Sequence, residues 1–265
     1  KVSVGSSMTL DLTYNTDFAQ VEADEQQINL DRFSLFFPEK RAFFLENAGL
    51  FSVGSGGGYS GPDIEMFFSR RIGVGSGGIP VPIVGGGRLT GTFSGMKVGV
   101  LSMVTDKVKD LTDQNNYSVF RLKKELPNRT HIGGMYTALD HTGDSGYINQ
   151  SYSIDAQLGL GELNKIVAFA GLTDTPGLNK DNAYAFRLEG ARDAKVVSSS
   201  LSYTEVGANF NPEMGYLKRE NYRKWSGRIF TRIRPKNDFG LLEVRPHINY
   251  DGYWKLNGFH QTGKL

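Results

Sequence analysis

The chain has 265 residues, a net charge of +2, 33 glycines, 12% aromatic residues and no cysteine. The lack of cysteine excludes a disulfide scaffold and a thiolate metal site, and the balanced charge excludes a general attraction to nucleic acid. A helical membrane protein is excluded because there is no apolar run of about 18 residues, whereas a membrane β-barrel hides its apolar residues by alternation and is not excluded.

Apolar and polar residues alternate with a period of two in several segments. The clearest are residues 8–14, 152–160, 184–188, 229–233 and 242–250. Because successive side chains of a strand point to opposite faces, each segment predicts a strand with one apolar and one polar face. A helical spacing explains none of them as well.

Short turn signals at residues 94–95, 126–129, 161–164 and 235–240 join the alternating segments. This arrangement predicts antiparallel hairpins that follow one another along the chain. The segments suit the roughly nine to eleven residues of a tilted membrane strand better than the five or six typical of soluble strands. The predicted fold class is all-β: an antiparallel transmembrane β-barrel, or the N-terminal part of one, with an inserted luminal loop and short helix.

The polar face separates a barrel from a soluble β-sandwich. Arginines with an acidic partner crowd one face of a single hairpin, which favours a wet, enclosed lumen; a solvated sandwich surface is the alternative. These residues are Arg228, Arg232, Arg234, Glu243, Arg245 and His247. We therefore expect residues 1–265 to form one β-barrel domain that is incomplete at its C-terminus.

Residues 19–53 break the alternation and predict a non-strand insert that folds into the lumen as a plug. Asp31 is placed to cap a short helix that ends at Pro38. The phenylalanines on both sides of residues 39–41 cannot all lie on one strand face. A folded-in loop that buries the rings and pairs the charges accommodates them.

The charges near this insert form the candidate site. Arg70 and Arg71 would be costly in a dry core without carboxylates, and Glu39 and Glu46 are the natural partners. We predict a structural ion-pair cluster that constricts the lumen. Its members are Glu39, Lys40, Arg41, Glu46, Arg70 and Arg71.

Four motifs, at residues 10–24, 36–47, 68–73 and 209–216, together resemble the DUF5916 family. The resemblance covers most of the chain and implies an outer-membrane β-barrel. In the family this barrel commonly follows a domain similar to family 9 carbohydrate-binding modules, which the present chain lacks. Ala42 stands where the family more often has proline, which implies a less stiff loop.

No catalytic or metal-ligating pattern is present. The glycine-rich residues 73–78 lack the lysine of a phosphate-binding loop, and residues 140–146 lack the ligand spacing of a calcium loop. The four histidines, at 131, 141, 247 and 260, are scattered along the chain. The sequence therefore predicts no catalytic residue, no metal and no cofactor, and it indicates no binding residue.

The resulting functional expectation is a pore or surface-assembly component of the outer membrane of a Gram-negative-type cell, linked to carbohydrate binding or uptake. Its expected partners are the lipid bilayer and a glycan held by a domain outside this chain. Protein partners stay unspecified, and nucleic acid is not expected. Two alternatives stay open: a carbohydrate-active enzyme of glycoside hydrolase type, using carboxylates such as Glu39 and Glu46, and a soluble β-sandwich binding module.

Overall fold

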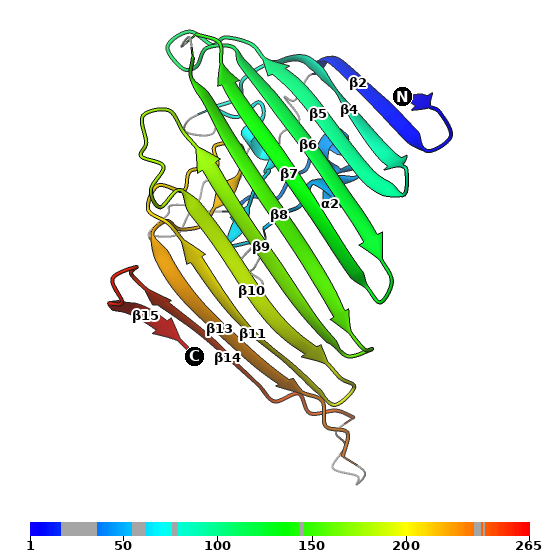
Figure 1. Ribbon diagram of the computed structural model, residues 1–265, viewed down its shortest axis with the longest axis vertical. Helices are drawn as coiled ribbons and strands as arrows, with labels where there is room; N and C mark the ends of the chain where they lie inside the picture. The colour runs from blue at the N-terminus through cyan, green and yellow to red at the C-terminus, as the bar shows by residue number, and fades with distance from the viewer. Residues whose placement is uncertain (17–35, 55–61, 76–78, 144–145, 236–239, 241) are drawn as a thin grey trace.

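The computed structural model is dominated by β-strands (Figure 1). It describes residues 1–16, 36–54, 62–75, 79–143, 146–235, 240 and 242–265. Its helices are short: α1 (Ala42–Leu45), α2 (Ala48–Phe51) and the 3-10 turn η1 (Ser69–Arg71). Across the described residues, no helix has both the length and the apolar character needed to cross a membrane.

Thirteen strands form one antiparallel sheet whose order follows the chain. They are β1 (Val2–Val4), β2 (Met8–Thr16), β4 (Ile83–Phe93), β5 (Met96–Thr105), β6 (Asn115–Leu126), β7 (Thr130–His141), β8 (Ile148–Leu160), β9 (Asn164–Asp174), β10 (Tyr184–Asp193), β11 (Val197–Val206), β13 (Tyr222–Thr231), β14 (His247–Trp254) and β15 (His260–Lys264). The two strands left out, β3 (Ile64–Glu65) and β12 (Tyr216–Leu217), pair with each other. The prediction of an all-β antiparallel fold is confirmed.

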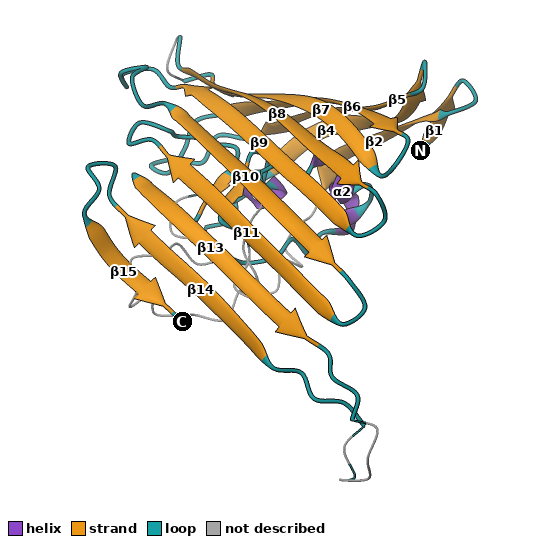
Figure 2. Cartoon of the chain, turned by 60° about the horizontal axis from the view of Figure 1, so that its bottom comes forward, coloured by secondary structure: helices purple, strands orange, loops and turns teal. Residues whose placement is uncertain are grey.

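The sheet curves around the short helices, which lie on its concave side (Figure 2). Strands β1 and β15 are its two edges, and in the described part of the chain they do not pair with each other, so the sheet is open. The central strands are long: β6 and β7 each have 12 residues and β8 has 13. These lengths exceed the five or six residues typical of soluble proteins.

Most of the predicted strands and turns are present. Residues 8–14, 152–160 and 184–188 lie in β2, β8 and β10. The turn at 94–95 joins β4 to β5, where Ser94 and Gly95 both have positive φ angles, as a tight hairpin requires. Analogous short turns join β6 to β7 and β8 to β9.

The strand predicted over residues 242–250 is only partly correct. Regular pairing in β14 begins at His247, and upstream of it Val244 makes an isolated bridge with Ile233. Pro246 explains the late start because proline has no N–H to donate to a ladder. Its carbonyl still accepts a hydrogen bond from the backbone N–H of Thr231, the last residue of β13.

The two faces of the sheet have opposite surroundings. Inward-facing residues of the central strands, such as Leu101, Met103 and Val119, are buried in one hydrophobic core with Phe44, Phe51, Ile64, Met66 and Ile72. On the convex face large apolar side chains are exposed, with Ile154 at 65% and Leu172 at 58%. The core therefore lies inside the curve of the sheet, and the apolar convex face lies outside it.

Candidate functional site

The concave face is the candidate site, because buried charges there meet the chain that the sheet encloses. We call residues 36–54 and 62–75 the concave segment; the predicted insert residues 19–35, including Asp31, lie outside the described part. Helix α2 packs on β5 and β6. Gly99 of β5 makes room for this packing, since a Cβ atom there would lie 2.8 Å from the Phe51 ring.

Arg88 of β4 is a cation of the concave face with several partners. It is only 1% exposed. Its Nη2 atom donates to Asp11 Oδ2 at 2.7 Å and to Glu46 Oε2 at 3.1 Å, while Nη1 donates to the carbonyls of Phe43 and Glu46. The guanidinium also lies 5.0 Å from the centre of the Phe43 ring. Arg88 thus fixes the end of α1 against β2 and β4.

Two further strand cations hold the concave segment at other points. Arg121 of β6 forms a bidentate pair with Asp155 of β8, at 2.6 and 2.9 Å, and its Nε atom donates to the Leu50 carbonyl at 3.1 Å. Lys224 of β13 donates to Asp63 Oδ2 at 2.8 Å, and both of these side chains are buried. Charged groups removed from water are costly unless they are paired in this way.

Inside the concave segment, Glu39 and Arg41 form a charged pair. Arg41 donates through Nη2 at 2.7 Å and through Nε at 2.8 Å, and Ser69 Oγ adds a third hydrogen bond to Glu39 at 2.6 Å. Burial raises the pKa of Glu39, but the Arg41 and Ser69 hydrogen bonds and the Arg41 charge outweigh it, so the pKa lies below the ordinary value. Arg41 also donates to the carbonyl of Ile72 at 2.6 Å.

The remaining predicted residues lie around this pair or apart from it. Arg70 donates to the Pro38 carbonyl at 3.0 Å, and Arg71 donates to the Gly215 carbonyl at 2.9 Å. Lys40 is exposed and its backbone N–H donates to the carboxylate of the preceding residue. Glu46 pairs with Lys1 and with Arg88. The structure therefore places Glu39, Arg41 and Arg70 together and Glu46 in the neighbouring Arg88 cluster.

Arg88, Arg121 and Lys224 were not predicted from the sequence. A signal did exist for Arg88, which is the one charged residue in β4, a strand otherwise rich in glycine and threonine. A charge at an inward position of such a strand needs a buried partner. Its partner Asp11 is 77 residues away, so the pairing itself could not be read from the sequence.

A pocket of about 320 Å³ lies between the concave segment and strands β4 and β5. Its polar lining includes Glu65, whose carboxylate accepts hydrogen bonds from Ser52 Oγ at 3.2 and 3.3 Å. Burial raises the pKa of Glu65 to about 7, an effect that hydrogen bonds from Ser52 and Val53 only partly offset. Five aromatic rings line the same pocket: Phe36, Phe44, Phe51, Phe67 and Phe68.

We expect Glu65→Gln to stabilise the protein at high pH and to have little effect at low pH. The folded pKa of about 7 exceeds the ordinary 4.5, so the folded state binds the extra proton. The stability that depends on this proton is complete below pH 4.5 and is lost as the pH rises to 7. Glutamine keeps an acceptor for Ser52 without the charge.

Thermal unfolding of both proteins at pH 4.5 and pH 8 measures this effect. The midpoint of Glu65→Gln should exceed that of the unsubstituted protein at pH 8 only. Glu220→Gln, at an exposed position, is the matched control and should behave alike at both values. Equal midpoints for Glu65→Gln and the parent at pH 8 would show that the carboxylate is not desolvated.

No metal centre is found among the residues that the structure describes, since no three histidine, aspartate or glutamate side chains gather as ligands there. Two described histidines each lie close to one carboxylate. His131 Nε2 lies 3.7 Å from Asp155 Oδ2, and His141 Nε2 lies 3.5 Å from Glu213 Oε2. Each pair thus brings one histidine to one carboxylate.

The N-terminal part of the chain resembles a known family. Residues 1–80 match the family model of DUF5916, a domain of unknown function. The N-terminal part of the chain is similar to the DUF5916 family. The match includes the motifs at 10–24, 36–47 and 68–73, which contain Asp11, the Glu39–Arg41 pair and η1. Comparison with curated proteins and with solved structures gave no match.

The fourth motif, residues 209–216, lies outside the matched region of DUF5916 but contacts it in space. The N–H of Phe68 donates to the Met214 carbonyl at 2.8 Å, and Tyr216 pairs with Glu65 between β12 and β3. The rings of Phe36, Phe68 and Tyr216 also lie within 5.7 Å of one another. The DUF5916 match and the last motif thus form one packed unit on the concave face.

Proposed function

We propose that this chain is part of an outer-membrane β-barrel of a Gram-negative-type cell, with its convex face in lipid. One observation carries the proposal: large apolar side chains are exposed on the convex face across neighbouring strands. Leu188, Leu201 and Ile229 on β10, β11 and β13 are 53%, 58% and 52% exposed. Soluble monomers rarely expose a contiguous apolar surface of this kind.

Polar and aromatic groups bound this apolar surface at one end of the strands. Tyr184 Oη donates to Glu205 Oε1 at 2.7 Å, and Arg223 Nε donates to Glu205 Oε2 at 2.8 Å. Tyr203 donates to the same carboxylate and its ring lies 4.8 Å from that of Trp225. Tyrosine and tryptophan with hydrogen-bonded polar ends favour the boundary between lipid and water.

The concave segment supports a fixed constriction of the lumen as part of this proposal. Cations from three strands, Arg88, Arg121 and Lys224, attach it to the sheet. A segment held by one buried ion pair and by hydrogen bonds from two buried guanidinium groups to its carbonyls would move only at a high energetic cost. We therefore propose a narrow pore or a rigid surface-assembly component; its link to carbohydrate rests on the domain that commonly precedes this region in the family.

Cysteine labelling on β11 tests the lipid exposure directly, because the chain has no native cysteine. Leu201 faces outward and is 58% exposed, whereas the adjacent Ser200 points to the opposite face of the strand. In membranes, Leu201→Cys should react with a lipophilic maleimide and resist a charged one. Ser200→Cys should react with the charged reagent.

The same two variants in membrane-free extracts provide the control. A protein recovered without detergent, in which Leu201→Cys reacts readily with the charged maleimide, would contradict the proposal and favour the soluble β-sandwich. Urea-washed membranes that retain the protein, together with alternating reactivity, would support it. The two labelled positions are neighbours on one strand. If the protein were unfolded, both cysteines would therefore react equally with the charged maleimide.

A further inference from the structure

The convex face carries a groove of about 650 Å³ near one end of strands β8 to β15. The groove is deep because two of the residues that line it are glycines, which have no side chain. Gly190 of β10 and Gly227 of β13 are the direct neighbours of Leu201 on β11, one on each side. A Cβ atom built at Gly190 would meet nothing within 4 Å, so the space beside Leu201 is open.

The floor of the groove is mainly apolar. Ile166, Leu201 and Tyr250 contribute side chains in successive positions across β9, β11 and β14. The backbone N–H and C=O groups of these strands are already used in the antiparallel ladders. Apart from the Tyr250 hydroxyl, the floor thus offers no hydrogen-bond partner to a peptide, whereas a hydrocarbon chain requires none.

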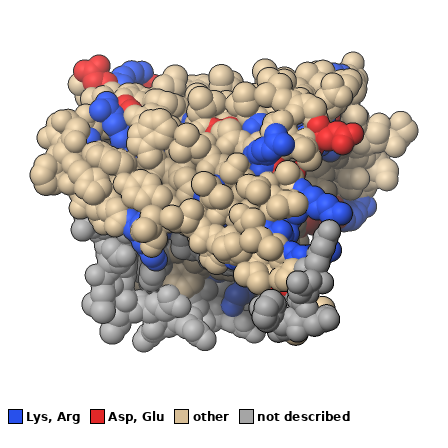
Figure 3. Space-filling model, turned by 90° about the horizontal axis from the view of Figure 1, so that it is seen from below, with Lys and Arg blue, Asp and Glu red and all other residues tan. Residues whose placement is uncertain are grey.

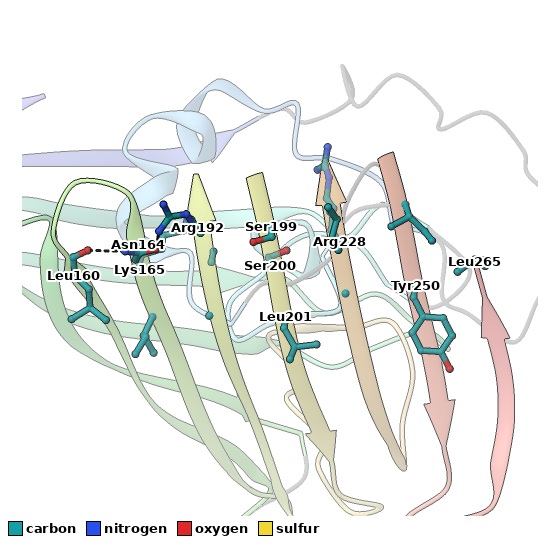
Figure 4. Close-up of a pocket in the computed structure, with 16 residues that line it drawn as sticks. Leu160, Asn164, Lys165, Arg192, Ser199, Ser200, Leu201, Arg228, Tyr250 and Leu265 are labelled. Atoms are coloured by element: carbon teal, nitrogen blue, oxygen red, sulfur yellow. Dashed lines mark hydrogen bonds between the residues drawn. The ribbon is translucent and has the colours of Figure 1, made fainter. Parts of the chain in front are cut away.

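One end of the groove is polar. Arg192 follows Gly190 by two residues on the same face of β10, about 7 Å further along the strand. It is exposed, pairs across the sheet with Ser199 and Asn164, and donates to Asn164 Oδ1 at 3.3 Å. Figure 4 shows Arg192 and Ser199 on the opposite side of the groove from Leu201 and Tyr250.

This end of the sheet is also basic as a whole. Beside the groove it is formed by the hairpins after β8, β10 and β13. Figure 3 views the molecule from this side, with basic side chains spread across it and fewer acidic ones. Arg234 and Arg245 share Glu243 as a partner. Among the described residues of these hairpins, the basic ones are Lys165, Arg192, Lys195, Arg232, Arg234 and Arg245, against the acidic Glu162, Asp193 and Glu243.

We propose that this groove binds an anionic phospholipid. One acyl chain lies along Leu201 between Gly190 and Gly227, and the phosphate accepts hydrogen bonds from Arg192 and Ser199. The apolar floor and the cation at its polar end match the two halves of such a lipid, and the basic hairpins favour a negatively charged headgroup. The inference rests on the proposed function, because only a convex face in the bilayer meets phospholipid.

The test uses the full chain in phosphatidylcholine vesicles with spin-labelled phosphatidylglycerol or spin-labelled phosphatidylcholine as the probe. Electron paramagnetic resonance gives the fraction of each probe immobilised on the protein. We expect a preference for phosphatidylglycerol that Arg192→Gln lowers about fivefold at that site, the effect of one basic residue near an anionic lipid. Gly190→Leu should fill the groove and lower the binding of both probes.

Lys180→Gln is the matched control, because Lys180 is an exposed cation in the loop between β9 and β10, at the other end of the strands. It should leave the lipid preference unchanged. An unchanged preference in Arg192→Gln would overturn the inference, and so would displacement of the probe by excess inorganic phosphate, which would indicate a site for soluble anions. A chain that fails to float with vesicles would overturn the proposed membrane location as well, whereas one that floats without headgroup preference would overturn the lipid site alone.

Discussion

Replacing Arg88 with alanine should lower the free energy of unfolding by about 3–5 kcal/mol, the range found when one partner of a buried ion pair is removed. Arg88 is 1% exposed and is the shared partner of Asp11 and Glu46. Its loss leaves the buried Asp11 carboxylate without this cation, and it leaves the carbonyls of Phe43 and Glu46 without this donor. The end of α1 should then detach from β4.

Urea unfolding in detergent micelles, followed by tryptophan fluorescence, measures the change. Arg228→Ala is the control: Arg228 lies on the same face of the sheet, but its side chain is exposed, and its removal should change the free energy of unfolding by less than about 1 kcal/mol. Similar losses for the two variants would show that Arg88 is not the anchor of the concave segment. Increased proteolysis near residues 42–51 in Arg88→Ala alone would support the anchoring role.

Placing a charge at the centre of the convex face should have an effect of similar size through a different mechanism. Ile154 lies in the middle of β8 and is 65% exposed. In a bilayer, arginine at this depth costs roughly 2–4 kcal/mol. We therefore expect Ile154→Arg to reduce the amount of protein assembled in the membrane severalfold, as measured by urea-washed membrane fractions.

Leu163→Arg is the matched control, because Leu163 is an exposed residue of the turn between β8 and β9 and should accept the charge. The direction of the Ile154→Arg effect distinguishes a convex face in lipid from one in water. On a convex face in water, the same substitution would cover an apolar patch with a charge and improve solubility. A higher soluble yield with no loss of folding would therefore contradict the membrane location.

Local patterns in the sequence were sufficient to predict the strands but not the arrangement of buried charges. Alternation in residues 152–160 predicted β8 because side-chain direction depends only on position along a strand. Glu39 and Arg41 lie two residues apart, so a local charge pattern placed them in one cluster. Lys224 and Asp63 are 161 residues apart, and their pairing follows from the curvature of the whole sheet, which no local pattern encodes.

The order of strands in the sheet has a kinetic consequence. Because each strand from β4 to β11 pairs with its sequence neighbour, the sheet can grow by adding one hairpin at a time, and each step closes only a short loop. The contacts of Asp63 with Lys224 and of β3 with β12 close much longer loops. We expect the concave segment to dock first on β4 to β6, and the β12–β13 region to enclose it in a late, slow folding phase.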